Sequence, residues 1–280
     1  HISEQTLSEG EDILGPAVFT FLLALFCNLI VSNAWSREIE VQLTYQVQWG
    51  DLDIAKAEAE WVFKEDTYTM SGASQTLGIV KKIRDFRGAS TLSGNIIEGA
   101  FQPVKLQITS ISDEQKKQAE TTWNPINGAI KTKRYPKIDK EKVFPLRQKL
   151  IKNSIDPFSA MLNTLKKIQK IGRCEGNYRI YDGFRTAILS FHDMGVEHLI
   201  KDRPFSFGGS TIKCGVVSKP TGGHQIKNRW RKKNKEKNNV VGFISELKSG
   251  LFIPVRIEVA TPIGKIISRL HMPSLIVTER

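Results

Sequence analysis

The chain has 280 residues, of which 40% are hydrophobic and 25% are charged, and its formal net charge is +12. These values are ordinary for a globular protein, so they exclude an intrinsically disordered chain, a collagen-like chain and a polytopic membrane protein. The length allows one large β domain or two smaller domains, each with its own hydrophobic core. The sequence has only three cysteines and five histidines, which leaves little room for a cysteine-rich scaffold or a module with several zinc ions.

An uncharged apolar stretch, residues 13–31, lies near the start of the sequence. Its densest part, residues 17–30, has the length of the hydrophobic region of a signal peptide, and the small residues Ser32-Asn33-Ala34 follow it. We therefore expect residues 1–34 to be an export signal that is cleaved after Ala34. An uncleaved N-terminal anchor and a buried core helix are the alternatives. The residues before the stretch disagree with a signal peptide, because they are acidic where basic residues are usual.

From Val41 onward the sequence has the pattern of an antiparallel β protein. Apolar and polar residues alternate over 41–49 and over 55–63, and a turn at Gly50-Asp51 separates the two segments, so they predict a β-hairpin. Three further segments extend the pattern, namely a strand at 68–74, a short helix at 77–83 and a strand at 101–108.

A longer helix is predicted in the middle of the chain. Asp156 and Pro157 are typical of the N-cap and the first helical position, and Gly172 is typical of a helix end. Between them, apolar residues recur at i, i+3, i+4 and i+7 from Phe158 to Ile168. The segment 131–152 before this helix is rich in lysine and arginine and has neither a helical nor a strand pattern, so we expect it to be a loop.

After the helix the pattern of strands returns. Residues 178–181 and 184–191 are separated by the pair Asp182-Gly183, which is the strongest signal for a short hairpin turn in the chain. The remaining strands are predicted at 211–218, 240–247, 252–260 and 265–271. Many antiparallel strands with one long helix exclude a parallel α/β fold. We expect a mainly β fold, in which a strongly curved or partly closed antiparallel sheet with one or two short helices forms a single domain over residues 35–280.

Cleavage of the signal would leave Cys174 and Cys214 as the cysteines of the mature chain. In an oxidising compartment these two residues can form a disulfide bond. The bond would close a loop of about 40 positions and would stabilise the protein by about 4 kcal/mol in the chain-entropy model. Two separate buried thiols are the alternative for a cytosolic protein. Two isolated cysteines are too few for a metal site.

The sequence contains none of the motifs that we searched for among common enzyme classes, namely G-x-S-x-G, H-E-x-x-H, a Walker loop, G-x-G-x-x-G and C-x-x-C. His192 and His198 can share a metal ion only if the chain folds back, and Asp51 and Asp53 are ordinary turn residues. We therefore expect a protein that is not an enzyme, with no catalytic residue, no metal ion and no cofactor. A hydrolase is the least favoured alternative, because a catalytic triad can assemble from distant positions.

The densest cluster of positive charge is residues 227–237, which contain seven basic residues and one acidic residue. Such a cluster with Trp230 can bind nucleic acid, but an exported protein meets little nucleic acid, so we expect no nucleic-acid partner. Phospholipid headgroups or lipopolysaccharide phosphates would attract the same loop, and a solvated loop without a ligand is the alternative. The candidate anion-binding residues are Lys227, Arg229, Arg231, Lys232, Lys233, Lys235 and Lys237.

Five short segments stand in a characteristic order and spacing, namely Trp49-Gly50, residues 156–162, Cys174 with residues 181–185, Cys214 and residues 252–257. In this order and spacing they resemble an exported proteobacterial family of unknown function, the domain-of-unknown-function family 3108 (DUF3108). The resemblance covers about residues 41–270. It implies a periplasmic or envelope-associated, mainly antiparallel β protein without an assigned catalytic site, and a cysteine pair at Cys174 and Cys214. The sequence departs from the family pattern in the loop 227–239 and in its acidic N-terminus.

From these features we expect a non-enzymatic β scaffold of the periplasm or cell envelope. Its partner would be another envelope component, which is a protein, an anionic lipid or lipopolysaccharide, and contact with a membrane surface is compatible with this function. The alternative is a carrier of a lipid or another lipophilic ligand on the concave face of the sheet. The candidate residues for such an apolar ligand face are Trp49, Trp61, Phe63 and Phe101, which also suit an ordinary core.

Overall fold

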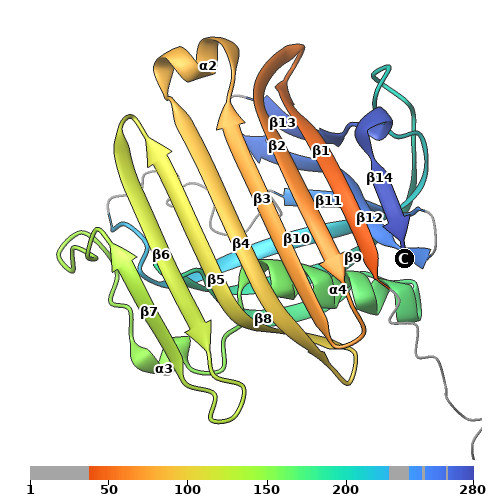
Figure 1. The fold of residues 1–280 in the computed structure, drawn as a ribbon. Helices are drawn as coiled ribbons and strands as arrows, with labels where there is room; N and C mark the ends of the chain where they lie inside the picture. The colour runs from red at the N-terminus through yellow and green to blue at the C-terminus, as the bar shows by residue number, and fades with distance from the viewer. Residues whose placement is uncertain (1–37, 227–239, 248–249, 263) are drawn as a thin grey trace, which may run out of the picture. The chain divides into compact units, whose positions relative to one another are not determined.

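The computed structural model describes residues 38–226, 240–247, 250–262 and 264–280. Within these residues, fourteen strands form one sheet in which every strand pair is antiparallel (Figure 1). The helices are α2 (Gly78–Ile83), α3 (Gln148–Ile151), α4 (Pro157–Ile171) and the 3-10 helix η2 (Met272–Ser274). The strands are β1 (Ile39–Trp49), β2 (Leu52–Phe63), β3 (Thr67–Thr76), β4 (Phe86–Ile97), β5 (Ala100–Ser112), β6 (Gln115–Trp123), β7 (Ile130–Tyr135), β8 (Gly176–Tyr181), β9 (Thr186–Leu199), β10 (Gly209–Gly222), β11 (Val240–Glu246), β12 (Phe252–Thr261), β13 (Gly264–Leu270) and β14 (Ile276–Glu279).

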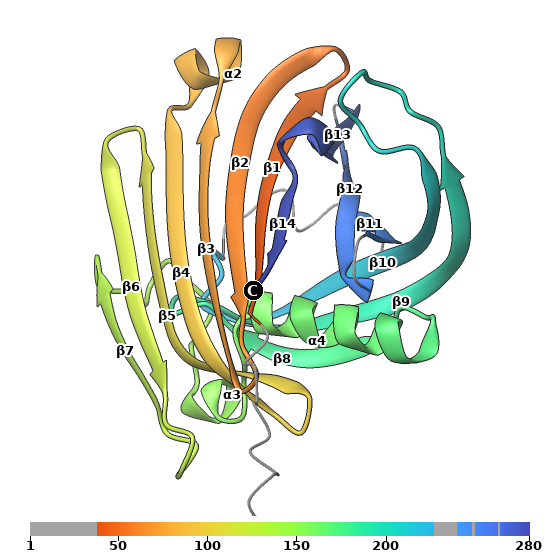
Figure 2. The ribbon, with the colours of Figure 1, turned by 45° about the vertical axis from the view of Figure 1, so that its right-hand side comes forward.

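The strands are arranged as two meanders that meet at β1. Their order is β7-β6-β5-β4-β3-β2-β1-β13-β12-β11-β10-β9-β8, and β14 also pairs with β1. Within β1–β7 and within β8–β13, strands that are neighbours in the sequence are neighbours in the sheet, and the pairing of β1 with β13 joins the two meanders. The two edges of the sheet are β7 and β8. The sheet curves strongly, and α4 lies in its hollow (Figure 2).

The two edges of the sheet approach each other without forming a ladder. Arg134 of β7 donates a hydrogen bond from Nη2 to the hydroxyl oxygen of Tyr181 in β8, over 2.7 Å. Ile155, in the segment that leads into α4, forms an isolated parallel bridge with Ile180 of β8. Trp123 at the end of β6 donates its indole N–H to the carbonyl oxygen of Ser154 over 2.8 Å. The sheet is therefore partly closed by side chains and by a connecting segment. We refer to this region between β6–β7 and β8 as the seam.

Helix α4 forms where its sequence predicts it. The carboxylate of Asp156 accepts hydrogen bonds from the N–H groups of Phe158 and Ser159, at 2.8 and 3.1 Å, which is the geometry of an N-cap. Gly172 ends the helix with a φ of +70°, a conformation that favours glycine. The buried side chains of α4 include Leu162, Leu165 and Ile168, and they belong to the same core cluster as Leu43 and Leu270 of the sheet.

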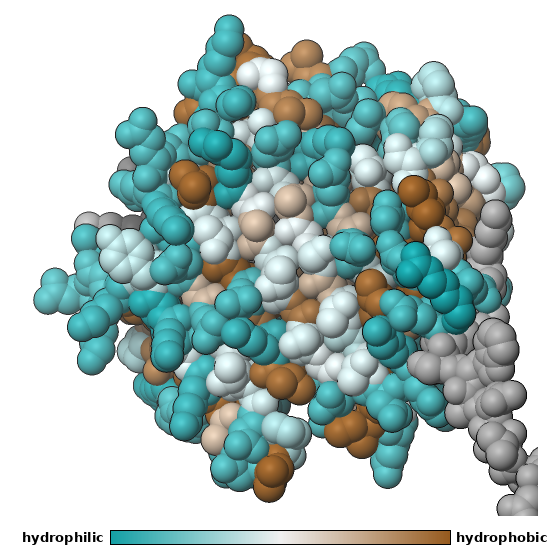
Figure 3. All heavy atoms as spheres, in the orientation of Figure 1, coloured by the Kyte–Doolittle hydropathy of each residue, from teal (hydrophilic) through white to brown (hydrophobic). Residues whose placement is uncertain are grey.

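The sheet has a buried inner face and a polar outer face. In β3, Tyr68 and Met70 are buried, whereas the alternate residues Thr69 and Ser71 are exposed. Figure 3 shows the outer face of the sheet, where hydrophilic and small residues surround scattered apolar ones. This alternation is the period-two pattern of the sequence, and it places the apolar side chains against α4.

A charged cluster fixes the loop after β9 to the sheet. Arg269 of β13, which is only 4% exposed, donates from Nε to both carboxylate oxygens of Asp202, at 3.0 and 3.1 Å. Its Nη1 donates to the side-chain oxygen of Gln48 in β1 over 2.9 Å. The hydrogen bonds from Arg269 lower the pKa of Asp202 below its ordinary value. The cluster joins β1, β13 and the loop.

The predicted fold class is confirmed, as are the helices at 77–83 and 156–172. The prediction of a loop over 131–152 is wrong in part, because this segment contains most of β7 and all of α3. The strand β7 was not predicted because few of its side chains are apolar, although half-buried and exposed positions alternate along it. In β7, Thr132 and Arg134 are half-buried, whereas Lys131 and Lys133 are exposed.

The hairpin between β8 and β9 also differs from its prediction. Tyr181 pairs with Thr186, so the connection has four residues, 182–185, and not the two residues of the predicted turn. The cause is the side chain of Asp182, whose carboxylate accepts hydrogen bonds from the N–H groups of Phe184 and Arg185, at 2.9 and 2.7 Å.

No helix in the described ranges is long and apolar enough to cross a membrane. The segment 1–34, where the export signal is predicted, lies outside the described residues.

Candidate functional site

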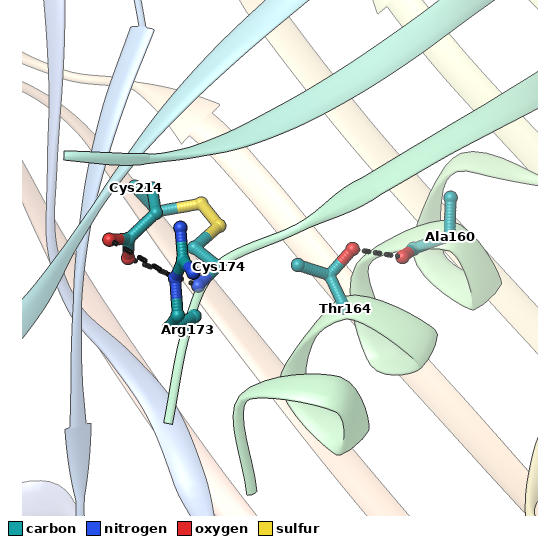
Figure 4. The surroundings of a disulfide bond; sticks show 6 residues. Ala160, Thr164, Arg173, Cys174 and Cys214 are labelled. Carbon is teal, nitrogen blue, oxygen red and sulfur yellow. Dashed lines mark hydrogen bonds and ion pairs between the residues drawn. A yellow bond between two sulfur atoms is a disulfide. The ribbon is translucent and has the colours of Figure 1, made fainter. Parts of the chain in front are cut away.

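The structure contains the predicted disulfide bond between Cys174 and Cys214. Cys174 follows the end of α4, and Cys214 lies in β10 beside a register shift in its pairing with β9. Their Cα atoms are 5.6 Å apart, and both residues are buried. Figure 4 shows the bond next to the last turns of α4. The disulfide therefore attaches the C-terminal end of the helix to the second meander.

The first turn of α4 is held by a chain of buried polar groups. The hydroxyl of Ser159 donates a hydrogen bond to the carboxylate of Asp156 and lies 2.6 Å from the hydroxyl oxygen of Tyr68 in β3. Burial raises the pKa of the Asp156 carboxyl and of the Tyr68 hydroxyl. Asp156 and Ser159 are both 0% exposed, so a substrate cannot reach this hydroxyl and carboxylate. The chain anchors the helix to the sheet.

A pocket of about 690 Å³ opens beside the seam. Its walls come from the β4–β5 hairpin, the β6–β7 hairpin, residues 153–155 and one face of α4. The volume lies in the range of about 300–1,000 Å³ that is typical of small-molecule sites. The apolar or aromatic residues of its lining are Ala100, Phe101, Pro103, Val104, Trp123, Pro125, Ile130, Ile155 and Tyr178.

The wall that α4 contributes is basic. Asn163, Lys166, Lys167 and Lys170 line the pocket and follow the spacing i, i+3, i+4 and i+7, so they lie on one face of the helix. Lys167 forms an ion pair with Glu175 over 3.3 Å, and Lys166 donates a hydrogen bond to the side-chain oxygen of Gln169 over 3.1 Å. Within the described part of the chain, Lys170 makes no hydrogen bond or ion pair.

Asn163 fixes this wall to the rest of the pocket. Its side-chain oxygen accepts a hydrogen bond from the backbone N–H of Phe101 over 2.9 Å, and its side-chain nitrogen donates to the carbonyl oxygen of Phe101 over 3.0 Å. The side-chain amide of Asn163 thus makes the two backbone hydrogen bonds that a neighbouring strand would otherwise make with Phe101. Asn163 and the three lysines were not predicted as site residues, because an ordinary solvent-exposed helix face has polar residues at the same spacing.

Of the four aromatic residues predicted to line a ligand face, three pack against one another and Trp49 lies apart from them. Trp61, which is 3% exposed, makes an edge contact with Phe63, and Phe63 makes one with Phe101, with ring centroids 6.3 and 5.9 Å apart. These three rings belong to the core cluster or pack against it, and of the four residues Phe101 is the one that lines the pocket. Trp49 lies 38% exposed at the end of β1. Because α4 fills the hollow of the sheet, the open space lies at the seam.

The predicted anion-binding loop, residues 227–237, lies outside the described residues. The described residues contain no group of three or more histidine, cysteine, aspartate or glutamate side chains arranged to hold a metal ion. His192 and His198 both lie in β9, opposite Gly215 and Ser210 of β10.

Fold and site together define an open, curved antiparallel sheet that holds a helix and carries a ligand-sized pocket at its seam. The sequence model of the DUF3108 family, described as a protein of unknown function, matches residues 44–270, and the chain belongs to this family. No curated protein matches the chain. Among solved structures, the chain is similar to the crystal structure of a β-barrel-like protein of the domain-of-unknown-function family DUF1849 from Brucella abortus. That similarity has a TM-score of 0.46 at 6% sequence identity and covers 86% of this chain and 98% of the other.

Proposed function

We propose that this protein is exported to the cell envelope, where it binds another envelope component and does not act as an enzyme. The observation that carries the proposal is the disulfide between Cys174 and Cys214. Such bonds persist in oxidising compartments and are rare in the cytosol. The apolar segment at residues 13–31 is consistent with export, either as a cleaved signal or as an anchor in the inner membrane.

The seam pocket is the proposed binding surface. It is large enough for a small molecule or for part of a lipid, and residues from the β4–β5 hairpin, the β6–β7 hairpin, segment 153–155, α4 and β8 line it. The buried hydroxyl of Ser159 and carboxylate of Asp156 are held in the core and serve the helix. A binding function therefore uses the groups that are accessible, which are apolar side chains and lysines.

The first test is cell fractionation combined with thiol trapping. We expect the protein in the periplasmic or inner-membrane fraction, with Cys174 and Cys214 inaccessible to an alkylating reagent after denaturation without a reductant. A matched control is the chain without residues 1–34, which stays in the cytoplasm and should be alkylated at both cysteines. Recovery of the unaltered protein in the cytoplasm with free thiols would contradict the proposal. The same fractionation distinguishes a cleaved signal from an uncleaved anchor.

The second test concerns the envelope itself. A strain that lacks the gene should become more sensitive to detergents, and the exported protein should restore resistance. The variant without residues 1–34 should not restore it, because it cannot reach the envelope. Unchanged detergent sensitivity in the deletion strain counts against a function in envelope integrity.

A lipophilic-ligand carrier is the second candidate function. The observation that favours it is the apolar lining of the pocket, to which Phe101, Val104 and Trp123 contribute. From the sequence we expect such a ligand on the concave face of the sheet. Because α4 occupies that face, a carrier of this fold would hold its ligand at the seam.

A further inference from the structure

We propose that the seam pocket binds an amphipathic anion, which is an acyl chain attached to a carboxylate or phosphate group. Lys166 and Lys170 of α4 would bind the anionic group, and the acyl chain would lie against Phe101, Val104 and Trp123. This inference rests on the proposed binding function and specifies its ligand class.

The charge of the pocket favours an anion. Three lysines line it, and Glu98 of the β4–β5 turn is the acidic residue among the lining residues. Lys167 is already paired with Glu175, whereas Lys166 and Lys170 have no ion-pair partner within the described ranges. An anion between these two lysines would accept charge-assisted hydrogen bonds, which are stronger than bonds between neutral groups.

The opposite wall favours an acyl chain. Phe101 and Val104 are half-buried and Trp123 is 8% exposed, and all three line the pocket. Trp123 belongs to the core cluster and Phe101 packs against it, so these two rings are held in place. The indole N–H of Trp123 is already bonded to the carbonyl oxygen of Ser154, so it does not seek a polar ligand group. Covering these atoms with methylene groups removes apolar surface from water.

The basic wall and the apolar wall are held in a fixed relation. Asn163 joins α4 to the backbone of Phe101 through two hydrogen bonds, so the helix face that carries the lysines is fixed relative to the start of β5. A preformed arrangement of one charged and one apolar wall lowers the cost of ordering the site when a ligand binds. It selects a ligand that carries both properties.

The test is a set of calorimetric titrations of the purified protein with four probes below their micelle concentrations. Oleate and lysophosphatidylglycerol carry a chain and an anionic group, monoolein carries the chain alone, and inorganic phosphate carries the charge alone. We expect at least one of the two anionic lipids to bind about tenfold or more tightly than monoolein, and phosphate to show no binding. Preference for oleate assigns the anionic group to a carboxylate, and preference for the lysophospholipid assigns it to a phosphate.

Two double variants complete the test. Lys166→Ser with Lys170→Ser should weaken binding of the anionic lipids about tenfold and leave monoolein unchanged. The control, Lys116→Ser with Lys117→Ser, removes the same charge from exposed positions in β6 and should bind like the unaltered protein. Equal affinities for oleate, lysophosphatidylglycerol and monoolein, or unchanged binding after loss of Lys166 and Lys170, overturn the inference. A disulfide-bonded, exported protein that binds none of the probes overturns it while leaving the proposed localisation intact.

Discussion

The hydroxyl oxygen of Tyr68 in β3 lies 2.6 Å from that of Ser159 in α4, at a position where neither residue is accessible to water. Ser159 is in turn bonded to Asp156, the N-cap of the helix. The first turn of α4 is therefore connected to the sheet by side chains that are 91 residues apart in the sequence. Because α4 carries the basic wall of the pocket, this connection also determines where the lysines lie.

Replacement of the helix cap should destabilise the whole domain. Asp156→Ala removes the acceptor of two buried N–H groups and of the Ser159 hydroxyl. We expect the free energy of unfolding to fall by about 2–4 kcal/mol, since both a cap and buried hydrogen bonds are lost. Urea denaturation measures the change. The control is Asp139→Ala, which removes an exposed aspartate that also accepts a backbone N–H, and it should destabilise the protein much less than Asp156→Ala.

The ion pair of Asp202 and Arg269 should make stability depend on acid pH. The pKa of Asp202 is lowered in the folded state, so the unfolded state binds more protons in acid. The stabilisation is thus complete above an unfolded pKa of about 3.9 and is lost as the pH falls below it. Asp202→Asn should lower stability at pH 7 and reduce the loss between pH 5 and pH 2.5, as measured by urea denaturation at several pH values. A difference between the two proteins that does not change with pH contradicts this assignment.

The disulfide should contribute a large share of the stability. Cys174→Ala with Cys214→Ala is expected to lower the free energy of unfolding by about 4 kcal/mol, because the unfolded chain regains the freedom of a closed loop. A reductant should destabilise the unaltered protein by a similar amount and leave the double variant unaffected. Denaturation curves with and without the reductant supply both measurements. Equal stability of the oxidised and reduced proteins would falsify this prediction.

Asn163 should affect both folding and ligand binding. Asn163→Leu removes the two hydrogen bonds to the backbone of Phe101, and we expect a loss of about 1–3 kcal/mol in stability. Binding of the anionic lipid should weaken as well, because the lysines lose their fixed position relative to the apolar wall. Gln107→Leu is the control, since Gln107 also makes two side-chain hydrogen bonds, from Thr91 and to Glu120, but at an exposed position of β5 outside the pocket lining. It should retain lipid affinity, and an equal loss in both variants would contradict the role of Asn163.

The strands and the long helix could be predicted from the sequence because their signals are local. Alternation over 41–49 and 55–63 depends on neighbouring residues, and so do the cap at Asp156 and the turn at Gly172. The strand in segment 131–152 could not be predicted in this way, because one inward position of β7 is filled by Arg134. Its partner Tyr181 lies on the opposite edge strand of the sheet. A strand whose inward positions hold a half-buried arginine and a threonine lacks the apolar alternation that predicts a strand.

The pocket could not be predicted, because its parts are distant in the chain. Asn163 and Phe101 are 62 residues apart, and the periodicity of a sequence carries no information about such a pair. The lysines at 166, 167 and 170 have the spacing of a solvent-facing helix surface. They line a pocket only because the fold brings the β4–β5 and β6–β7 hairpins next to them.

The pairing of β1 with β13 has a consequence for the order in which the chain folds. Trp49 of β1 pairs with Leu52 of β2 on one side and with Ile266 of β13 on the other. During synthesis β2 follows directly after β1, whereas β13 is made near the end of the chain. Until residue 270 has emerged, one edge of β1 exposes unpaired N–H and C=O groups that can associate with other chains. Pairing between segments so far apart is slow. The two meanders can therefore form separately, and completion of the chain is the event that joins them into one sheet.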